Sequence, residues 1–132
     1  MIYQQNQPLR VAVIDMYEGA DNQGMRCIRE LLNQFAEMFN RDLVRDEFDV
    51  RRTSVLPDMN YDIYICSGGP GSPLDSKGTD WENAFFLWIK KTLSYNANES
   101  NQTKKPVFFI CHSFQLACRY FNVAEVSKRK TT

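Results

Sequence analysis

The strongest constraint on the fold is a regular alternation between short, almost wholly apolar runs and longer segments with helical periodicity. The apolar runs lie at 9–14, 61–66 and 106–110. Continuous apolarity of this length is typical of a strand that is covered on both faces. Because helical segments separate the runs and leave room for crossovers, the sequence predicts an α/β three-layer sandwich with a mainly parallel sheet.

Two helices are predicted most clearly. The first spans residues 23–40, with Asp21 or Asn22 as its N-cap. The second opens at Thr79, with Glu82 three residues later in a capping-box pattern. Helical spacing predicts one buried stripe on the first helix, made of Ile28, Leu31, Leu32, Phe35, Met38 and Phe39. A third helix is predicted at 113–120, and weaker strands at 48–52 and 123–126.

Composition excludes some partners. Sixteen lysines and arginines balance sixteen aspartates and glutamates, so no net charge attracts phosphates. No apolar run approaches the roughly 18 residues that span a membrane. We therefore expect neither nucleic acid nor a membrane as a partner. The length of 132 residues fits one domain, and four cysteines without C-x-x-C spacing favour reduced thiols in a cytoplasmic protein without a metal site.

Unusual residues follow the three apolar runs, where parallel sheets place their ligands. They are Asp15, the segment 67–71 and Cys111. Cys111 lies between a predicted strand and a predicted helix, the position of a nucleophile elbow, and the helix N-terminus favours a thiolate there. The alternative is a small thiol buried in the core. Asp15 is expected to orient the neighbouring loops.

The segment 67–71 reads Ser-Gly-Gly-Pro-Gly. Glycines at a strand end let backbone N–H groups face a ligand, and such donors stabilise an oxyanion when a thiolate attacks a carbonyl carbon. The alternative is a tight connecting loop. The segment does not match the phosphate-binding G-x-x-x-x-G-K-[ST] pattern, which argues against a P-loop nucleotide site.

Together the two segments resemble a known family. The chain reads Y-D-I-Y-I-C-S-G-G-P-G-S-P and, about forty residues later, P-V-F-F-I-C-H-S-F-Q-L-A. This pattern resembles the class I (triad) glutamine amidotransferases, and GMP-synthase-like glutaminase domains look nearest. The resemblance implies a flavodoxin-like fold, a cytoplasmic enzyme without a cofactor, L-glutamine as substrate, and a synthase domain or subunit that receives the ammonia.

The resemblance also implies individual roles. Cys111 matches the nucleophile that forms a γ-glutamyl thioester. Gly69 and His112 match the positions whose backbone N–H groups form the oxyanion hole. Gly71 and Gln115 match positions that contact the bound glutamine.

Two departures from the family pattern bear on activity. Phe109 and Ser113 stand where the elbow usually has small residues, and Phe109 must find space or shift the elbow. The family also takes a His and a Glu from a downstream H-x-E motif, whereas this sequence contains one histidine, His112, and no H-x-E. We therefore expect residues 1–132 to be the N-terminal portion of a longer domain, without ordinary glutaminase activity by themselves.

Three alternatives remain. Cysteine-peptidase-like and chaperone-like relatives in the same superfamily often read C-H-G at the elbow, which Cys111-His112-Ser113 partly resembles, and there the adjacent His takes part in the site. A non-catalytic binding module on the same fold would explain Phe109 and the missing H-x-E. A flavin-binding domain is the least favoured, because the loop after Asp15 lacks a Ser/Thr-rich phosphate cradle.

Overall fold

A computed structural model describes residues 7–130. Strands and helices alternate along them in the order β1 (Leu9–Asp15), α1 (Gln23–Met38), β2 (Leu43–Asp49), α2 (Val50–Thr53), β3 (Ile63–Cys66), α3 (Asp80–Ala97), β4 (Val107–Phe109) and α4 (His112–Phe121). The described strands form one sheet in the order β2-β1-β3-β4, and every neighbouring pair is parallel. Their carboxyl ends therefore lie at one edge of the sheet.

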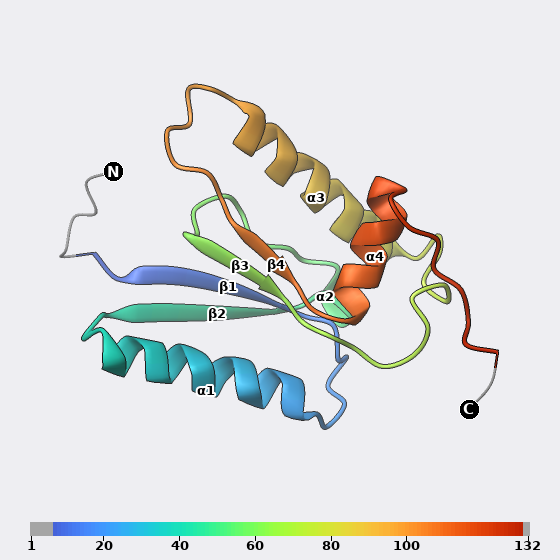
Figure 1. Ribbon diagram of the computed structural model, residues 1–132, viewed down its shortest axis with the longest axis horizontal. Coiled ribbons are helices and arrows are strands. Elements are labelled where there is room, and N and C mark those ends of the chain that lie inside the picture. Colours follow the sequence, from blue (N-terminus) through green and yellow to red (C-terminus); the bar gives the residue numbers. More distant parts are fainter. Residues whose placement is uncertain (1–6, 131–132) are drawn as a thin grey trace.

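The sheet lies between two helical layers. α1 covers one face, while α3 and α4 cover the other (Figure 1). This arrangement and the strand order confirm the predicted flavodoxin-like three-layer α/β sandwich with a parallel sheet. The prediction of a single domain over 1–132 stays a prediction, since it includes residues 1–6 and 131–132, which lie outside the described part.

The side chains of β1 alternate between two cores, because successive strand residues point to opposite faces. Val11 and Val13 pack with Met25 and Ile28 on the α1 side. Ala12 and Ile14 belong to the larger core under α3 and α4, which also contains Tyr64, Phe85, Trp88, Ile89 and Leu116. β1 is thus buried on both faces, as its continuous apolarity predicted.

Both predicted helix starts are confirmed. The Asn22 side chain accepts a hydrogen bond from the Met25 N–H at the start of α1, and Thr79 accepts one from the Glu82 N–H at the start of α3. In a complete capping box, the Glu82 carboxylate would accept a hydrogen bond from the Thr79 N–H. Here it accepts hydrogen bonds from Ser76 and from Arg119 of α4. Because Arg119 also donates to the Pro73 carbonyl, this buried pair holds the loop after β3 against both helices.

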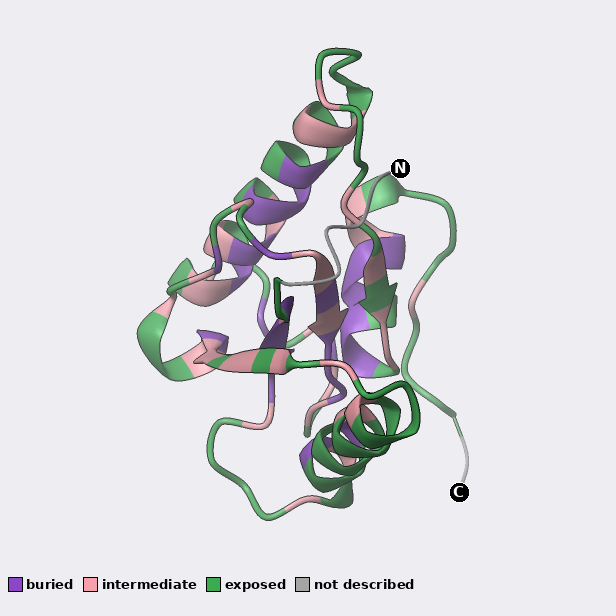
Figure 2. Ribbon diagram, turned by 90° about the vertical axis from the view of Figure 1, so that its left-hand side faces the viewer, coloured by how far each residue is buried: buried purple, intermediate pink, exposed green. Residues whose placement is uncertain are grey.

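The predicted buried stripe of the first helix is wrong over most of its length. Ile28 is buried, but Leu31, Phe35, Met38 and Phe39 are exposed by 64%, 41%, 76% and 62%, and Leu32 is half-buried. Figure 2 shows α1 as mostly exposed. Periodicity identified an apolar face correctly, yet among residues 7–130 only the first half of that face meets the sheet.

Two of the weaker strand predictions are also wrong. The predicted strand at 48–52 is the end of β2 followed by α2, because the Asp49 side chain accepts a hydrogen bond from the Arg52 N–H and caps a helical turn at Val50. The predicted strand at 123–126 does not form. α4 ends at Phe121, its C-cap residue Asn122 is left-handed with φ of 53°, and Val123 beyond it is 73% exposed.

Two absences apply to residues 7–130. None of their helices is both long enough and apolar enough to cross a membrane. No group of three or more His, Cys, Asp or Glu side chains in this range is arranged to hold a metal ion.

Candidate functional site

Cys111 occupies a sharp turn between β4 and α4. Its φ is 50° and its ψ is −103°, a conformation that non-glycine residues rarely adopt, and it is the N-cap residue of α4. The residue is exposed. Backbone strain of this kind costs of order 1–3 kcal/mol and is concentrated at functional sites. The structure therefore presents Cys111 at the carboxyl edge of the sheet in a strained elbow beside a helix N-terminus.

Ser113 secures this elbow to the sheet. Its hydroxyl oxygen accepts a hydrogen bond from the Ile110 N–H at 2.9 Å and lies 2.9 Å from the Cys66 carbonyl, to which it can donate. The residue is fully buried. Ser113, which stands where the family elbow usually has a small residue, thus joins the start of α4 to the end of β3. The sequence did not predict this role.

Phe109 finds space in the core. Its ring meets Phe85 of α3 edge to face, with centroids 6.3 Å apart. The large side chain therefore points into the α3 layer, and the strained turn at Cys111 forms beside it.

The glycine loop after β3 lies directly beside the elbow. A methyl group on Gly68 would lie 3.5 Å from Cβ of Cys111, and one on Gly69 would lie 2.5 Å from the Met16 carbonyl oxygen. Ser67 fixes the start of the loop by accepting a hydrogen bond from the Met16 N–H. Glycine at 69 is thus required by the close approach of the backbone after β1. The two segments singled out in the sequence are neighbours in space.

The His112 side chain is buried and contacts Arg51. It is 2% exposed, and its Nε2 lies 3.1 Å from Nη2 of Arg51. Burial, reinforced by the Arg51 charge, lowers the pKa of His112 to about 4. The ring is therefore neutral at pH 7, with Nε2 accepting from Arg51. This geometry gives no support to His112 as a base for Cys111.

Arg51 is a site residue that the sequence did not reveal. Its Nη1 and Nη2 both lie 3.0 Å from the Pro70 carbonyl, to which they donate, and its guanidinium stacks on Trp81. Burial lowers the pKa of Arg51. α2 therefore places a cation against the glycine loop and against His112, whereas the sequence predicts a strand at residue 51.

Gly71 and His112 line a cavity of about 210 Å³, together with Glu18, Arg51, Asp75 and Trp81 among others. Gly71 has a φ of 83°, which favours glycine. Gln115 is half-buried one turn along α4 from Cys111, and its N–H donates to the Cys111 carbonyl. Gln115 is thus linked to Cys111 through the backbone, while Cys111 does not line this cavity.

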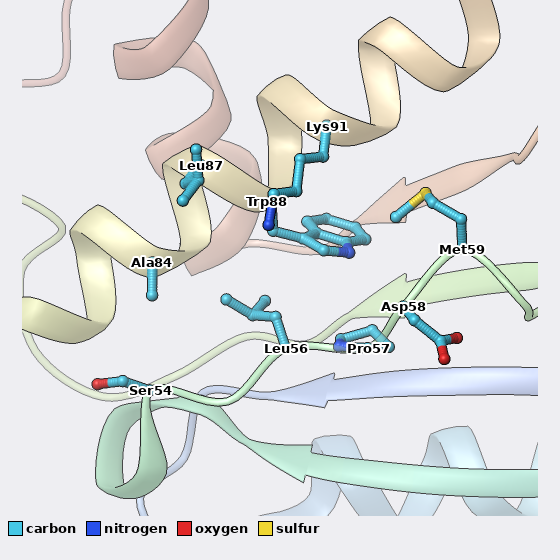
Figure 3. A pocket seen from close by; sticks show the side chains of 9 residues that line it. All are labelled: Ser54, Leu56, Pro57, Asp58, Met59, Ala84, Leu87, Trp88 and Lys91. Atoms are coloured by element: carbon cyan, nitrogen blue, oxygen red, sulfur yellow. The ribbon is translucent and has the colours of Figure 1, made fainter.

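A separate pocket of about 480 Å³ lies between α3 and the segment 54–59 (Figure 3). Leu56, Pro57 and Met59 face Trp88 across it, and Lys91 lies at its edge. No residue of the Cys111 elbow or of the glycine loop lines this pocket. Although this pocket is larger than the one beside His112, it is therefore not part of the candidate site.

The fold and the elbow define a flavodoxin-like α/β protein with a cysteine at the carboxyl edge of its sheet. The fold is similar to the crystal structure of a glutamine amidotransferase from Thermotoga maritima, with a TM-score of 0.59 and 17% sequence identity. The match covers 87% of this chain and 44% of that chain, so this chain spans less than half of that protein. No model of a known protein family matches, and no curated protein sequence does. At this identity the likeness shows the fold.

Proposed function

We propose that this chain carries the nucleophile of a glutamine amidotransferase. The Cys111 thiolate attacks the side-chain amide carbon of L-glutamine, the amide nitrogen takes up a proton and leaves as ammonia, and a γ-glutamyl thioester remains. Water then cleaves the thioester, giving glutamate and the free thiol. The observation that carries this proposal is the strained elbow at Cys111, exposed at the carboxyl edge of the sheet beside Gly68.

The remaining roles are proposed from the resemblance of the two sequence motifs. We assign oxyanion stabilisation to the backbone N–H groups of Gly69 and His112. Gly71 and Gln115 are assigned to substrate contact. In this proposal a synthase domain or subunit receives the ammonia, and a GMP-synthase-like acceptor is the specific form that the sequence motifs favour. The protein is proposed to act in the cytoplasm.

The amidotransferases that the motifs resemble use the His and Glu of an H-x-E motif, which does not occur in these 132 residues, and His112 is bound to Arg51. We therefore expect no ordinary glutaminase activity from the chain by itself. Release of ammonia at a normal enzymatic rate that disappears in Cys111→Ala would contradict this expectation.

The binding part of the proposal is tested by protection. Cys27 and Cys111 are both exposed, whereas Cys66 and Cys118 are buried, so each chain carries its own control thiol. L-Glutamine is expected to slow alkylation of Cys111 by iodoacetamide and to leave Cys27 unaffected, with D-glutamine giving no protection. Equal alkylation of Cys111 with and without L-glutamine would contradict the proposal.

A further inference from the structure

Tyr17 lies beside the candidate nucleophile. A methyl group on Gly68 would lie 3.0 Å from the Tyr17 hydroxyl oxygen and 3.5 Å from Cβ of Cys111, so both groups border the same small space. A methyl group on Gly24, near the start of α1, would overlap the same hydroxyl oxygen. Two glycines from different parts of the chain thus leave a slot that the Tyr17 hydroxyl occupies.

The backbone around Tyr17 is fixed from two directions. Asp15 accepts a hydrogen bond from the Tyr17 N–H at 2.8 Å, and the Tyr17 carbonyl accepts one from Ala20 at 2.9 Å. The preceding Met16 N–H donates to Ser67 of the glycine loop at 2.9 Å. The position of Tyr17 relative to the loop and the elbow is therefore built into the fold.

The Tyr17 hydroxyl remains available as a donor. It makes no hydrogen bond with any of residues 7–130. Burial raises the pKa of Tyr17, and the nearby charges of Cys111, Asp15 and Cys27 add to this effect. The phenol therefore keeps its proton at neutral pH. A thiolate is a hydrogen-bond acceptor, and a donor that reaches it favours the charged form over the thiol.

We propose that Tyr17 positions and stabilises the thiolate of Cys111 by donating a hydrogen bond from its hydroxyl, in the slot left by Gly24 and Gly68. This inference rests on the proposed role of Cys111 as nucleophile. Cys111 is exposed, so its side chain has room to rotate toward the oxygen when it ionises. The phenol proton stays on oxygen, and the thiol proton passes to solvent. Tyr17 is thus a positioning residue.

The test is the pH dependence of Cys111 alkylation by iodoacetamide, measured in a Cys27→Ser background so that one exposed thiol remains. Tyr17→Phe keeps the ring and removes the donor. It is expected to raise the pH of half-maximal alkylation by about one unit and to slow alkylation at neutral pH about tenfold. The rate at alkaline pH, where every molecule is a thiolate, is expected to stay unchanged.

Gly24→Ala gives a second, independent perturbation. Alanine is the better helix former, so α1 remains intact, but the new methyl group displaces the hydroxyl. We expect the pH profile to shift in the same direction as in Tyr17→Phe, with no further shift when both changes are combined. Tyr120→Phe removes a hydroxyl from α4 and is the matched control, for which no shift is expected.

Two results would overturn the inference. The first applies when Cys111 of the parent is alkylated at lower pH than Cys27 is in a Cys111→Ser chain. In that case, an unshifted pH profile of Cys111 alkylation in a folded Tyr17→Phe variant would overturn the inference. The second is a shift of the pH profile by Gly24→Ala that is just as large in the Tyr17→Phe background, where the hydroxyl is absent. If instead the parent Cys111 reacts with the same pH profile as Cys27, the proposed nucleophile itself fails, which separates the two proposals.

Discussion

The neutral His112 ring makes stability depend on pH in a calculable way. The pKa of His112 is about 4 in the folded chain and 6.5 in its ordinary state. Between pH 6.5 and 4, His112 is protonated in the unfolded chain but stays neutral in the folded chain. The free energy of unfolding therefore falls as the pH is lowered from 6.5 toward 4, and this contribution is fully present above 6.5. The two values give a loss of about 2 kcal/mol on acidification from neutrality to about pH 5.

The assay is urea unfolding followed by tryptophan fluorescence, since Trp88 is 3% exposed and becomes solvated on unfolding. His112→Gln supplies a side chain of mixed donor and acceptor character that does not titrate. Each protein is compared with its own stability at neutral pH, which cancels the fixed cost of the substitution. The difference between the two proteins then cancels the titration of carboxylates that they share. The wild type is expected to lose about 2 kcal/mol more than the variant by about pH 5. Parallel curves would refute the argument that burial and Arg51 keep His112 neutral.

Three substitutions at the elbow and loop test the geometry further by chemical denaturation. Cys111→Gly relieves a strained conformation and is expected to raise the free energy of unfolding by about 1 kcal/mol, and a loss of stability would contradict the strain. Ser113→Ala removes the hydroxyl that joins Ile110 to the end of β3, and we expect a loss of about 1 kcal/mol; an unchanged midpoint would show that the hydroxyl is not needed. Gly69→Ala forces the loop away from the Met16 carbonyl and is expected to cost about 1–3 kcal/mol, whereas a neutral result would mean that the loop yields freely.

The sequence predicted the parts of the fold that depend on local pattern. The strands β1, β3 and β4 were recognisable because they are apolar throughout, and the position of Cys111 followed from its place between a strand and a helix. The edge strand β2 was misplaced because its charged residues, such as Arg45 and Glu47, pair with each other and mask the strand pattern. The exposure of α1 was unpredictable because periodicity marks an apolar face without showing what packs on it.

The side chains around the elbow and the glycine loop were beyond sequence reasoning for a different reason. Arg51 contacts His112, which is 61 residues away in the sequence, and nothing in the local sequence of α2 indicates this contact. The Tyr17 hydroxyl lies next to Gly24 and Gly68 because neither residue has a side chain that would occupy its space. Such steric complementarity becomes visible only when distant segments are brought together.

The central claim is that Cys111 is a nucleophile directed at glutamine. The most direct test treats the folded chain with an electrophilic glutamine analogue, such as a chloroketone, and maps the adduct by mass spectrometry. We predict a single adduct on Cys111, suppressed by excess L-glutamine, while Cys27, which is also exposed, stays unmodified. An unlabelled Cys111, or equal labelling of both cysteines, would contradict the claim and favour a binding module on the same fold.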